Sequence, residues 1–126
     1  KTMVAKLGLE SKIQLTGYRD DMSEVYRSLD IFVMPSYEEN FANTLLEAMA
    51  SGCVCIGTMS GGTVNIIDDG VDGYLIEPRS ADALMKGLIR ALDQKDLWRD
   101  IKTKAREKAL NEFDLKKVTE KFEELL

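Results

Sequence analysis

Two glutamates, Glu39 and Glu47, are the residues of this sequence best suited to bind a polar ligand through carboxylates. They bracket residues 40–46, which are expected to lead from a loop into a helix. The first turn of a helix presents unpaired N–H groups and a partial positive charge, which suit a phosphate or a diphosphate. The loop amides could bind sugar hydroxyls, and the carboxylates could accept hydrogen bonds from a hexose and from a ribose. The arrangement therefore fits a nucleotide-sugar.

A structural interpretation of the same residues stays open. Thr44 and Glu47 have the spacing of a capping box, in which each side chain bonds the backbone N–H of the other. Glu38 and Glu39 would then be solvated charges on a loop. Spacing alone does not decide between the two interpretations.

The residue types present exclude several kinds of site. The chain has no histidine, which excludes a Ser-His triad, a histidine general base and a metal site built from histidine. Cys53 and Cys55 are expected on one face of a strand, too close along the chain for an ordinary disulfide. We expect them to be reduced core residues of a cytosolic protein. Any chemistry must therefore use carboxylates, amides, hydroxyls and cations.

The charge balance limits the partners. The chain has 17 basic and 22 acidic residues, a net charge of −5, and no basic strip dense enough to follow a phosphate backbone, so nucleic acid is a poor partner. The longest apolar runs are far shorter than the roughly 20 residues that span a bilayer. Lysines near the C-terminus alternate with acids and are expected to form a solvated face, with peripheral contact to anionic lipid as a minor alternative.

The elements that must position the two glutamates alternate along the chain. The patterns predict a helix to about residue 9 and one over residues 20–30, and a helix from Thr44 to Ser51 that ends at Gly52. They also predict a short helix over residues 63–69, after the glycines at 61 and 62, and three helices after residue 80, the last over residues 113–126. Between them, short strands are predicted at residues 12–17, 31–35, 53–58 and 74–78.

This alternation predicts a doubly wound parallel α/β sheet of Rossmann-like type. Ligands bind such sheets at the carboxyl edge of the strands. Residues 35–47 form one of the crossings from strand to helix at that edge.

Residues 30–78 resemble the carboxy-terminal, donor-binding domain of the retaining glycosyltransferases of family four, which have the GT-B fold. The resemblance rests on Glu39, seven residues and Glu47, on the following EAMASG, and on the DIFVMPS strand that precedes them. A Gly-Gly turn and DGVDGYLIEP follow in the family's order. The similarity extends from about Gly17 to the last helices, so several motifs in register carry it.

The resemblance implies a role for each site residue. Glu39 corresponds to the catalytic-site carboxylate beside the donor sugar, where it binds hydroxyls and helps to stabilise charge at the anomeric carbon. Glu47 corresponds to the acid that binds the ribose hydroxyls, and it can still complete its helix cap. The other substrate-binding residues implied are Gly17, Asn40, Phe41, Ala42, Asn43, Thr44 and Leu45. Asn40 and Ala42 stand where many relatives have glycine, so these loop amides are expected to approach the sugar differently.

The resemblance also implies the reaction. The parent protein is expected to transfer a sugar, with retention, from a nucleoside-diphosphate sugar to a saccharide or lipid-linked acceptor bound by an amino-terminal domain. Residues 1–126 would be the donor-binding domain without its first strand and helix, inactive alone, with neither metal nor cofactor. The expected location is the cytoplasm, including the inner face of the membrane. Front-side displacement is favoured, because a nucleophilic Glu39 would need a second carboxylate across the bond.

Other readings of the sequence remain open. The chief rival function is a nucleotide-binding α/β module without chemistry. A sugar-nucleotide epimerase is less favoured, since such enzymes commonly also use histidine. Acidic residues at 19–21 and 68–70 could bind a metal, but helix capping and a turn are the simpler roles.

Overall fold

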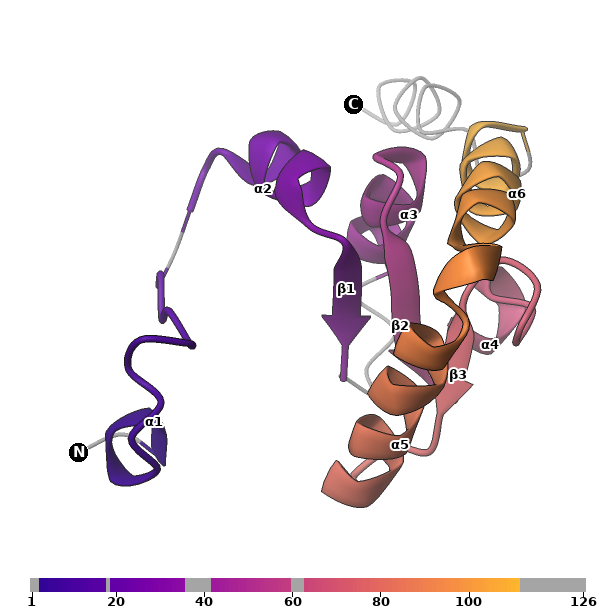
Figure 1. Cartoon of the computed structure of the whole chain (residues 1–126). Helices are drawn as coiled ribbons and strands as arrows, with labels where there is room; N and C mark the ends of the chain where they lie inside the picture. The colour runs from indigo at the N-terminus through magenta and orange to yellow at the C-terminus, as the bar shows by residue number, and fades with distance from the viewer. Residues whose placement is uncertain (1–2, 18, 36–41, 60–62, 112–126) are drawn as a thin grey trace.

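The computed structural model describes most of the chain (Figure 1). The described residues are 3–17, 19–35, 42–59 and 63–111, with only the backbone described at 42 and 43. The predicted last helix, over residues 113–126, lies outside this part.

The centre of the molecule is a three-stranded parallel sheet. Its strands are β1 (Ile31–Met34), β2 (Val54–Thr58) and β3 (Tyr74–Ile76), in the order β1-β2-β3. Val33 pairs with Ile56, and Ile56 pairs in turn with Tyr74. All five residues of β2 are buried, which is why its sequence does not alternate between apolar and polar residues, and Thr58 is its one buried polar side chain. The prediction of a parallel α/β sheet is confirmed.

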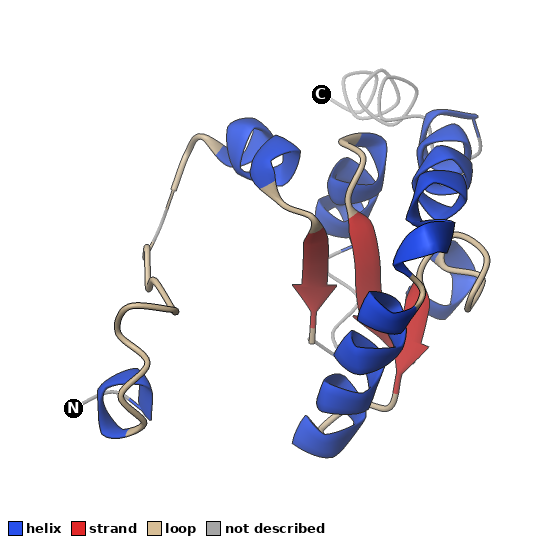
Figure 2. Cartoon of the chain, in the orientation of Figure 1, coloured by secondary structure: helices blue, strands red, loops and turns tan. Residues whose placement is uncertain are grey.

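Helices cover both faces of the sheet (Figure 2). One face packs on α3 (Ala42–Ala50), on α4 (Thr63–Ile66) and on alanines of α6 (Trp98–Asn111). The other face packs on α5 (Ala81–Asp93) and on Trp98 and Ile101 of α6. Successive residues of β2 serve opposite faces, so Cys55 belongs to the first core and Ile56 to the second.

The predicted strand over residues 12–17 is wrong. No strand is present there, and Ile13 and Leu15 are 43% and 68% exposed. This segment leads away from the sheet toward α1 (Met3–Lys6), so it has no neighbouring strand to pair with (Figure 1). Two alternating apolar residues indicate a strand only where a partner edge exists. The described part of the sheet therefore has three strands and not the four that were predicted.

The predicted start of the helix at Thr44 is also wrong. Helix α3 begins at Ala42, which puts Thr44 inside the first turn and not at the cap, so the capping box with Glu47 is not formed. Ala42 is a good helix former, and nothing in the sequence stops the helix from extending back to it. The end was predicted to within one residue, since α3 stops at Ala50 and a turn through Gly52 follows. Gly52 has a φ of 91°, a conformation that favours glycine, and its N–H donates to Met49.

The remaining helices differ in how they begin and end. Helix α2 (Met22–Ser28) has Asp21 at its N-cap, but the Asp21 carboxylate pairs with Arg19 and makes no cap bond. Ser80 caps α5 by accepting a hydrogen bond from the Ala83 N–H. A short 3-10 turn, Lys95–Leu97, joins α5 to α6. The helix predicted over residues 63–69 is shorter, ending at Ile66.

Candidate functional site

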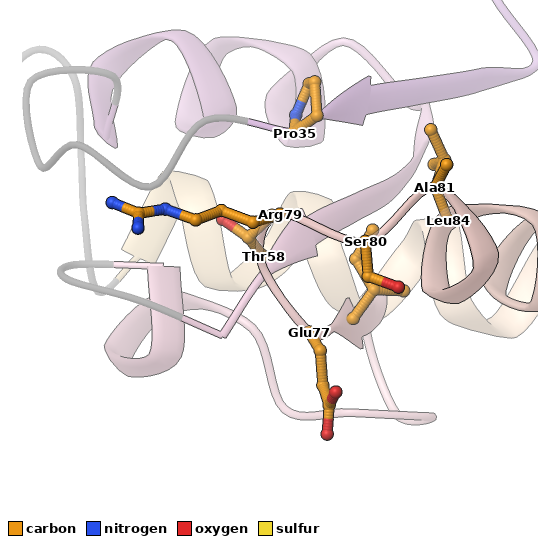
Figure 3. Close-up of a pocket in the computed structure, with 8 residues that line it drawn as sticks. Pro35, Thr58, Glu77, Arg79, Ser80, Ala81 and Leu84 are labelled. Atoms are coloured by element: carbon orange, nitrogen blue, oxygen red, sulfur yellow. The ribbon is translucent and has the colours of Figure 1, made fainter.

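The carboxyl edge of the sheet is hollowed by a cavity of about 270 Å³ (Figure 3). The ends of β2 and β3, the residue directly after β1 and the first turn of α5 contribute to its wall. The lining residues are Pro35, Thr58, Ile76, Glu77, Arg79, Ser80, Ala81 and Leu84. This is the edge at which the sequence analysis placed the ligand, because the chain passes from β1 to α3 here.

Arg79 and Glu77 are the charged residues in the lining of this cavity. Figure 3 shows the Arg79 side chain extended past Thr58, while Glu77 points the other way. The Arg79 backbone has a φ of 59°, the left-handed region that non-glycine residues rarely occupy. The sequence analysis missed Arg79. The sequence could have indicated it, because Arg79 is a cation in the short connection between β3 and Ser80, the N-cap of α5.

The first turn of α3 begins at the same edge. Its backbone N–H groups have no acceptor within the helix, as at every helix start, so they can face an anion. Leu45 is fully buried and Thr44 half-buried, so Leu45 can serve a ligand only through its backbone. Its side chain anchors the helix in the core, which fixes the direction of the amides.

Glu47 lies in the second turn of α3, with its side chain exposed. It lines a second cavity of about 250 Å³ between α2 and α3, together with Ser23, Tyr26, Ala50 and Ser51. Burial raises the pKa of Tyr26, and the nearby negative charge of Glu47 raises it further. Tyr26 therefore stays neutral at ordinary pH.

Tyr26 is held from several sides. It is 3% exposed, and its ring meets Phe32 edge to face, with the centroids 5.6 Å apart. Its carbonyl oxygen accepts a hydrogen bond from the Cys53 thiol, with 3.0 Å between sulfur and oxygen. The sequence analysis did not single out Tyr26. Its place beside Glu47 in the wall of the cavity depends on how α2 and α3 meet.

The structure brings some of the expected site residues together. Thr44, Leu45 and Glu47 share α3 with the backbone of Ala42 and Asn43. Gly17 lies in the exposed segment before α2, with a φ of 65°. Glu39, Asn40 and Phe41 lie outside the described residues, so their predicted roles stay predictions.

The acidic turn after α4 has structural partners. Asp69 forms an ion pair with Arg90, with 2.9 Å between the nearest atoms, and also accepts the Leu75 N–H. Asp68 and Asp72 both pair with Lys108 of α6. Over the described ranges, no three acids, cysteines or histidines converge as a metal site would require.

The two cysteines lie in the core, as the sequence analysis predicted. Cys53 and Cys55 are both free and fully buried. Burial raises the pKa of each thiol, and for Cys55 it does so strongly. They are therefore inert core residues.

Comparison with known proteins shows which family the sequence of this chain belongs to. The family model described as Glycosyl transferases group 1 matches residues 1–108. The chain is 32% identical over 121 residues to N-acetyl-alpha-D-glucosaminyl L-malate synthase of Bacillus anthracis, which covers 96% of this chain and 32% of that protein. It is also 32% identical over 120 residues to UDP-Gal:alpha-D-GlcNAc-diphosphoundecaprenol alpha-1,3-galactosyltransferase of Escherichia coli, covering 94% of this chain and 30% of that protein. The chain thus spans about a third of these relatives.

A solved structure agrees with this match at the level of the fold. The crystal structure of Anabaena HepE in complex with UDP and glucose superposes with a TM-score of 0.85 at 23% identity, covering 97% of this chain and 34% of HepE. In the described part of this chain, no helix has the length and apolar character to cross a membrane.

Proposed function

Because this chain belongs to the glycosyl transferases of group 1, we propose that it is the donor-binding part of an enzyme that transfers a sugar from a nucleoside-diphosphate sugar with retention. The observation that carries the proposal is the placement of α3. Its first turn opens at the carboxyl edge of the sheet, and Glu47 follows five residues after Ala42. At 1.5 Å per residue, that is about 7.5 Å along the axis. A diphosphate at the first turn would leave the adjoining ribose beside Glu47.

The names of the relatives support the class of donor. The Escherichia coli relative is named for UDP-Gal, and the HepE structure holds UDP and glucose. UDP-Gal is a nucleoside-diphosphate sugar, and UDP with glucose are the two parts of such a donor. The placement of α3 does not select the base or the sugar of the donor. We expect the segment after residue 17 to recognise the base and the loop after β1 to recognise the sugar.

The proposed reaction needs positioned dipoles more than it needs a base. The bond from the anomeric carbon to the diphosphate oxygen breaks, and the acceptor hydroxyl oxygen bonds to the same face of that carbon. The proton of that hydroxyl passes to the departing diphosphate oxygen. The amides and dipole of α3 stabilise the charge that develops on the diphosphate. Glu39 would lie beside the anomeric carbon, in the role that the family resemblance gives it.

The acceptor side of the reaction falls to parts of the protein beyond this chain. The relatives are about three times as long as the chain. We therefore assign the saccharide or lipid-linked acceptor to a separate amino-terminal domain. Residues 1–126 alone are expected to bind donor and to transfer nothing.

Contact with a membrane has little support from the described lysines. Lys104 pairs with Asp100 at 3.0 Å, Lys108 is engaged by two aspartates, and Lys102 lies over the Trp98 ring at 5.4 Å. These cations already have acidic or aromatic partners. Lys104 is exposed, as the predicted solvated face requires, but the Lys108 side chain is only 13% exposed and serves the fold.

Isothermal titration of this chain with UDP, GDP and ADP tests the donor-binding proposal, with Glu47→Gln as the variant. We expect one nucleotide to bind the wild-type chain and Glu47→Gln to weaken it about tenfold, since a hydrogen bond to a charged group is lost. Glu24→Gln, an exposed change on α2, is the control and should leave binding unaltered. Equal affinity in Glu47→Gln and wild type would contradict the proposal. Retention is tested separately, from the anomeric configuration of the product made by the full-length parent.

A further inference from the structure

The cavity at the carboxyl edge of the sheet holds a cation, Arg79. The cavity has a volume of about 270 Å³, and Arg79 and Glu77 are the charged residues of its lining. Arg79 is exposed, and Figure 3 shows its side chain extended past Thr58 at the end of β2, while Glu77 points the other way. The positive charge therefore lies at the edge where parallel α/β sheets bind their ligands.

The backbone of Arg79 is strained. Arg79 lies between β3 and Ser80, the N-cap of α5, and its φ is 59°. A left-handed backbone costs a non-glycine residue stability, so the turn by itself would favour glycine. The turn therefore does not account for an arginine at this position, and its side chain is the part that requires an explanation.

The cavity and the start of α3 share the same edge. Pro35 follows β1 directly, lies in the cavity wall and begins the connection from β1 to α3. Strand β2 lies between β1 and β3, so at a spacing of about 4.8 Å between neighbouring strands the ends of β1 and β3 are about 10 Å apart. A side chain that begins after β3 and extends past Thr58 of β2 covers much of that distance.

The chemistry of a guanidinium suits a diphosphate. A nucleoside diphosphate carries several negative charges, and the start of a helix such as α3 supplies only about half an elementary charge. A guanidinium adds a full positive charge and a planar set of N–H donors that fit phosphate oxygens. Its five donors also allow it to bind a protein acceptor and a phosphate at the same time.

We infer that Arg79 binds the diphosphate of the donor from the β3 side of the carboxyl edge. This inference rests on the proposed function, and it adds a binding residue from outside α3. The partner of Arg79 is the phosphate that bears the sugar, because the other phosphate adjoins the ribose beside Glu47. Arg79 therefore also stabilises the charge that develops on this phosphate when the bond to the sugar breaks.

A purely structural role for Arg79 makes a different prediction. If the side chain only supported the turn before α5, its loss would lower the stability of the fold and affect all nucleotides alike. The binding role instead predicts a loss of affinity that is confined to ligands with the second phosphate. A nucleoside diphosphate and the monophosphate of the same base therefore separate the two roles.

The test uses Arg79→Met, which removes the charge but keeps an unbranched side chain and the same backbone strain. Isothermal titration would give dissociation constants for whichever of UDP, GDP and ADP binds most tightly and for its monophosphate. We expect Arg79→Met to weaken the diphosphate about tenfold and the monophosphate less than about twofold, since a charged hydrogen bond to the second phosphate is lost. Equal weakening of both ligands, or of neither, would overturn the inference.

The matched control is Arg99→Met, which changes the net charge of the chain by the same amount. Arg99 is exposed in the first turn of α6, and the 13 residues of α5 put it about 20 Å from the carboxyl edge. Both nucleotides should bind this variant as they bind the wild type. Arg79→Lys keeps the charge without the planar donors and should recover part of the affinity that Arg79→Met loses.

A second measurement observes Arg79 in the wild-type chain. The side-chain Nε–H of Arg79 is identified in the NMR spectrum by the loss of its signal in Arg79→Met. We expect this signal to shift with the diphosphate and with inorganic pyrophosphate and to stay in place with the monophosphate. The backbone amides of α5 should stay in place, because the contact is made by the guanidinium. A signal that ignores both diphosphate ligands would overturn the inference.

The inference and the proposed function fail in different ways. If Glu47→Gln weakens the nucleoside diphosphate and Arg79→Met binds it as the wild type does, the inference is overturned while the donor site stands. If the wild-type chain binds no nucleoside diphosphate, the proposed function is contradicted and the inference falls with it.

Discussion

Single residues in this chain show how acids that suggest a ligand site can serve the fold. Asp72 is 2% exposed, accepts the Asp68 N–H at 2.8 Å and pairs with Lys108. The Lys108 ammonium also donates to the Ile66 carbonyl at 2.9 Å. Burial lowers the pKa of Lys108, but the hydrogen bonds and charges of Asp72 and Asp68 outweigh it and hold the pKa above its ordinary value. The acidic turn is thereby attached to α6.

Lys108→Met should destabilise the protein strongly. The substitution leaves the Asp72 carboxylate buried without its cation, which costs about 3 kcal/mol or more. The control is Lys104→Met, whose partner Asp100 lies on the same helix at an exposed position, and this change should cost less than about 0.5 kcal/mol. Urea unfolding measures both free energies. A similar loss of unfolding free energy in the two variants would contradict a stabilising role for the ion pair between Lys108 and Asp72.

The left-handed backbone at Arg79 allows a second prediction. A non-glycine residue with φ near 59° is strained by about 1 kcal/mol relative to glycine. We therefore expect Arg79→Gly to be about 1 kcal/mol more stable than Arg79→Ala, because both lose the side chain and only alanine keeps the strain. Thermal unfolding of the two variants checks this, and equal melting temperatures would refute it.

Sequence patterns predicted those helices and strands whose formation depends on residues nearby in the sequence. The patterns at residues 31–35 and 53–58 predicted β1 and β2, although β1 is an edge strand of the described sheet with only Met34 fully buried, and Gly52 predicted the end of α3. The patterns failed where the outcome depends on partners distant in sequence. Ile13 and Leu15 have no strand beside them, and Tyr26 and Glu47 line one cavity because α2 packs on α3. Helix α3 began early because no residue near Ala42 stops it.

The packing of α5 on β3 depends on Gly87. A Cβ at this position would lie 2.6 Å from Cγ2 of Ile76, which is too close for the helix to stay where it is. Although alanine is the better helix former by about 1 kcal/mol, we expect Gly87→Ala to cost a net 1–3 kcal/mol through overpacking. Lys86→Ala, at an exposed position of the same helix, should change stability by less than about 0.5 kcal/mol. A stabilised Gly87→Ala variant would show that the helix can shift without cost.

At the scale of the whole molecule, the features assigned to the donor gather around one helix. The start of α3 and the cavity lined by Arg79 lie at the carboxyl edge, and Glu47 and Tyr26 follow between α3 and α2. The family match covers residues 1–108, and the sequence alone was enough to predict both the family and the class of fold. The contacts of Glu39 lie outside the described residues, so the sugar end of the site stays a prediction.

An amide NMR titration of this chain with UDP, GDP and ADP tests whether α3 binds the nucleoside diphosphate. We expect one nucleotide to shift the amides of residues 42–47 and those of α2 around Tyr26, while α5 and α6 stay unchanged. Loss of the α2 shifts in Glu47→Gln, with the shifts at residues 42–45 kept, would assign the ribose to Glu47. Shifts confined to other elements, or none with any of the three nucleotides at millimolar concentration, would contradict binding at α3.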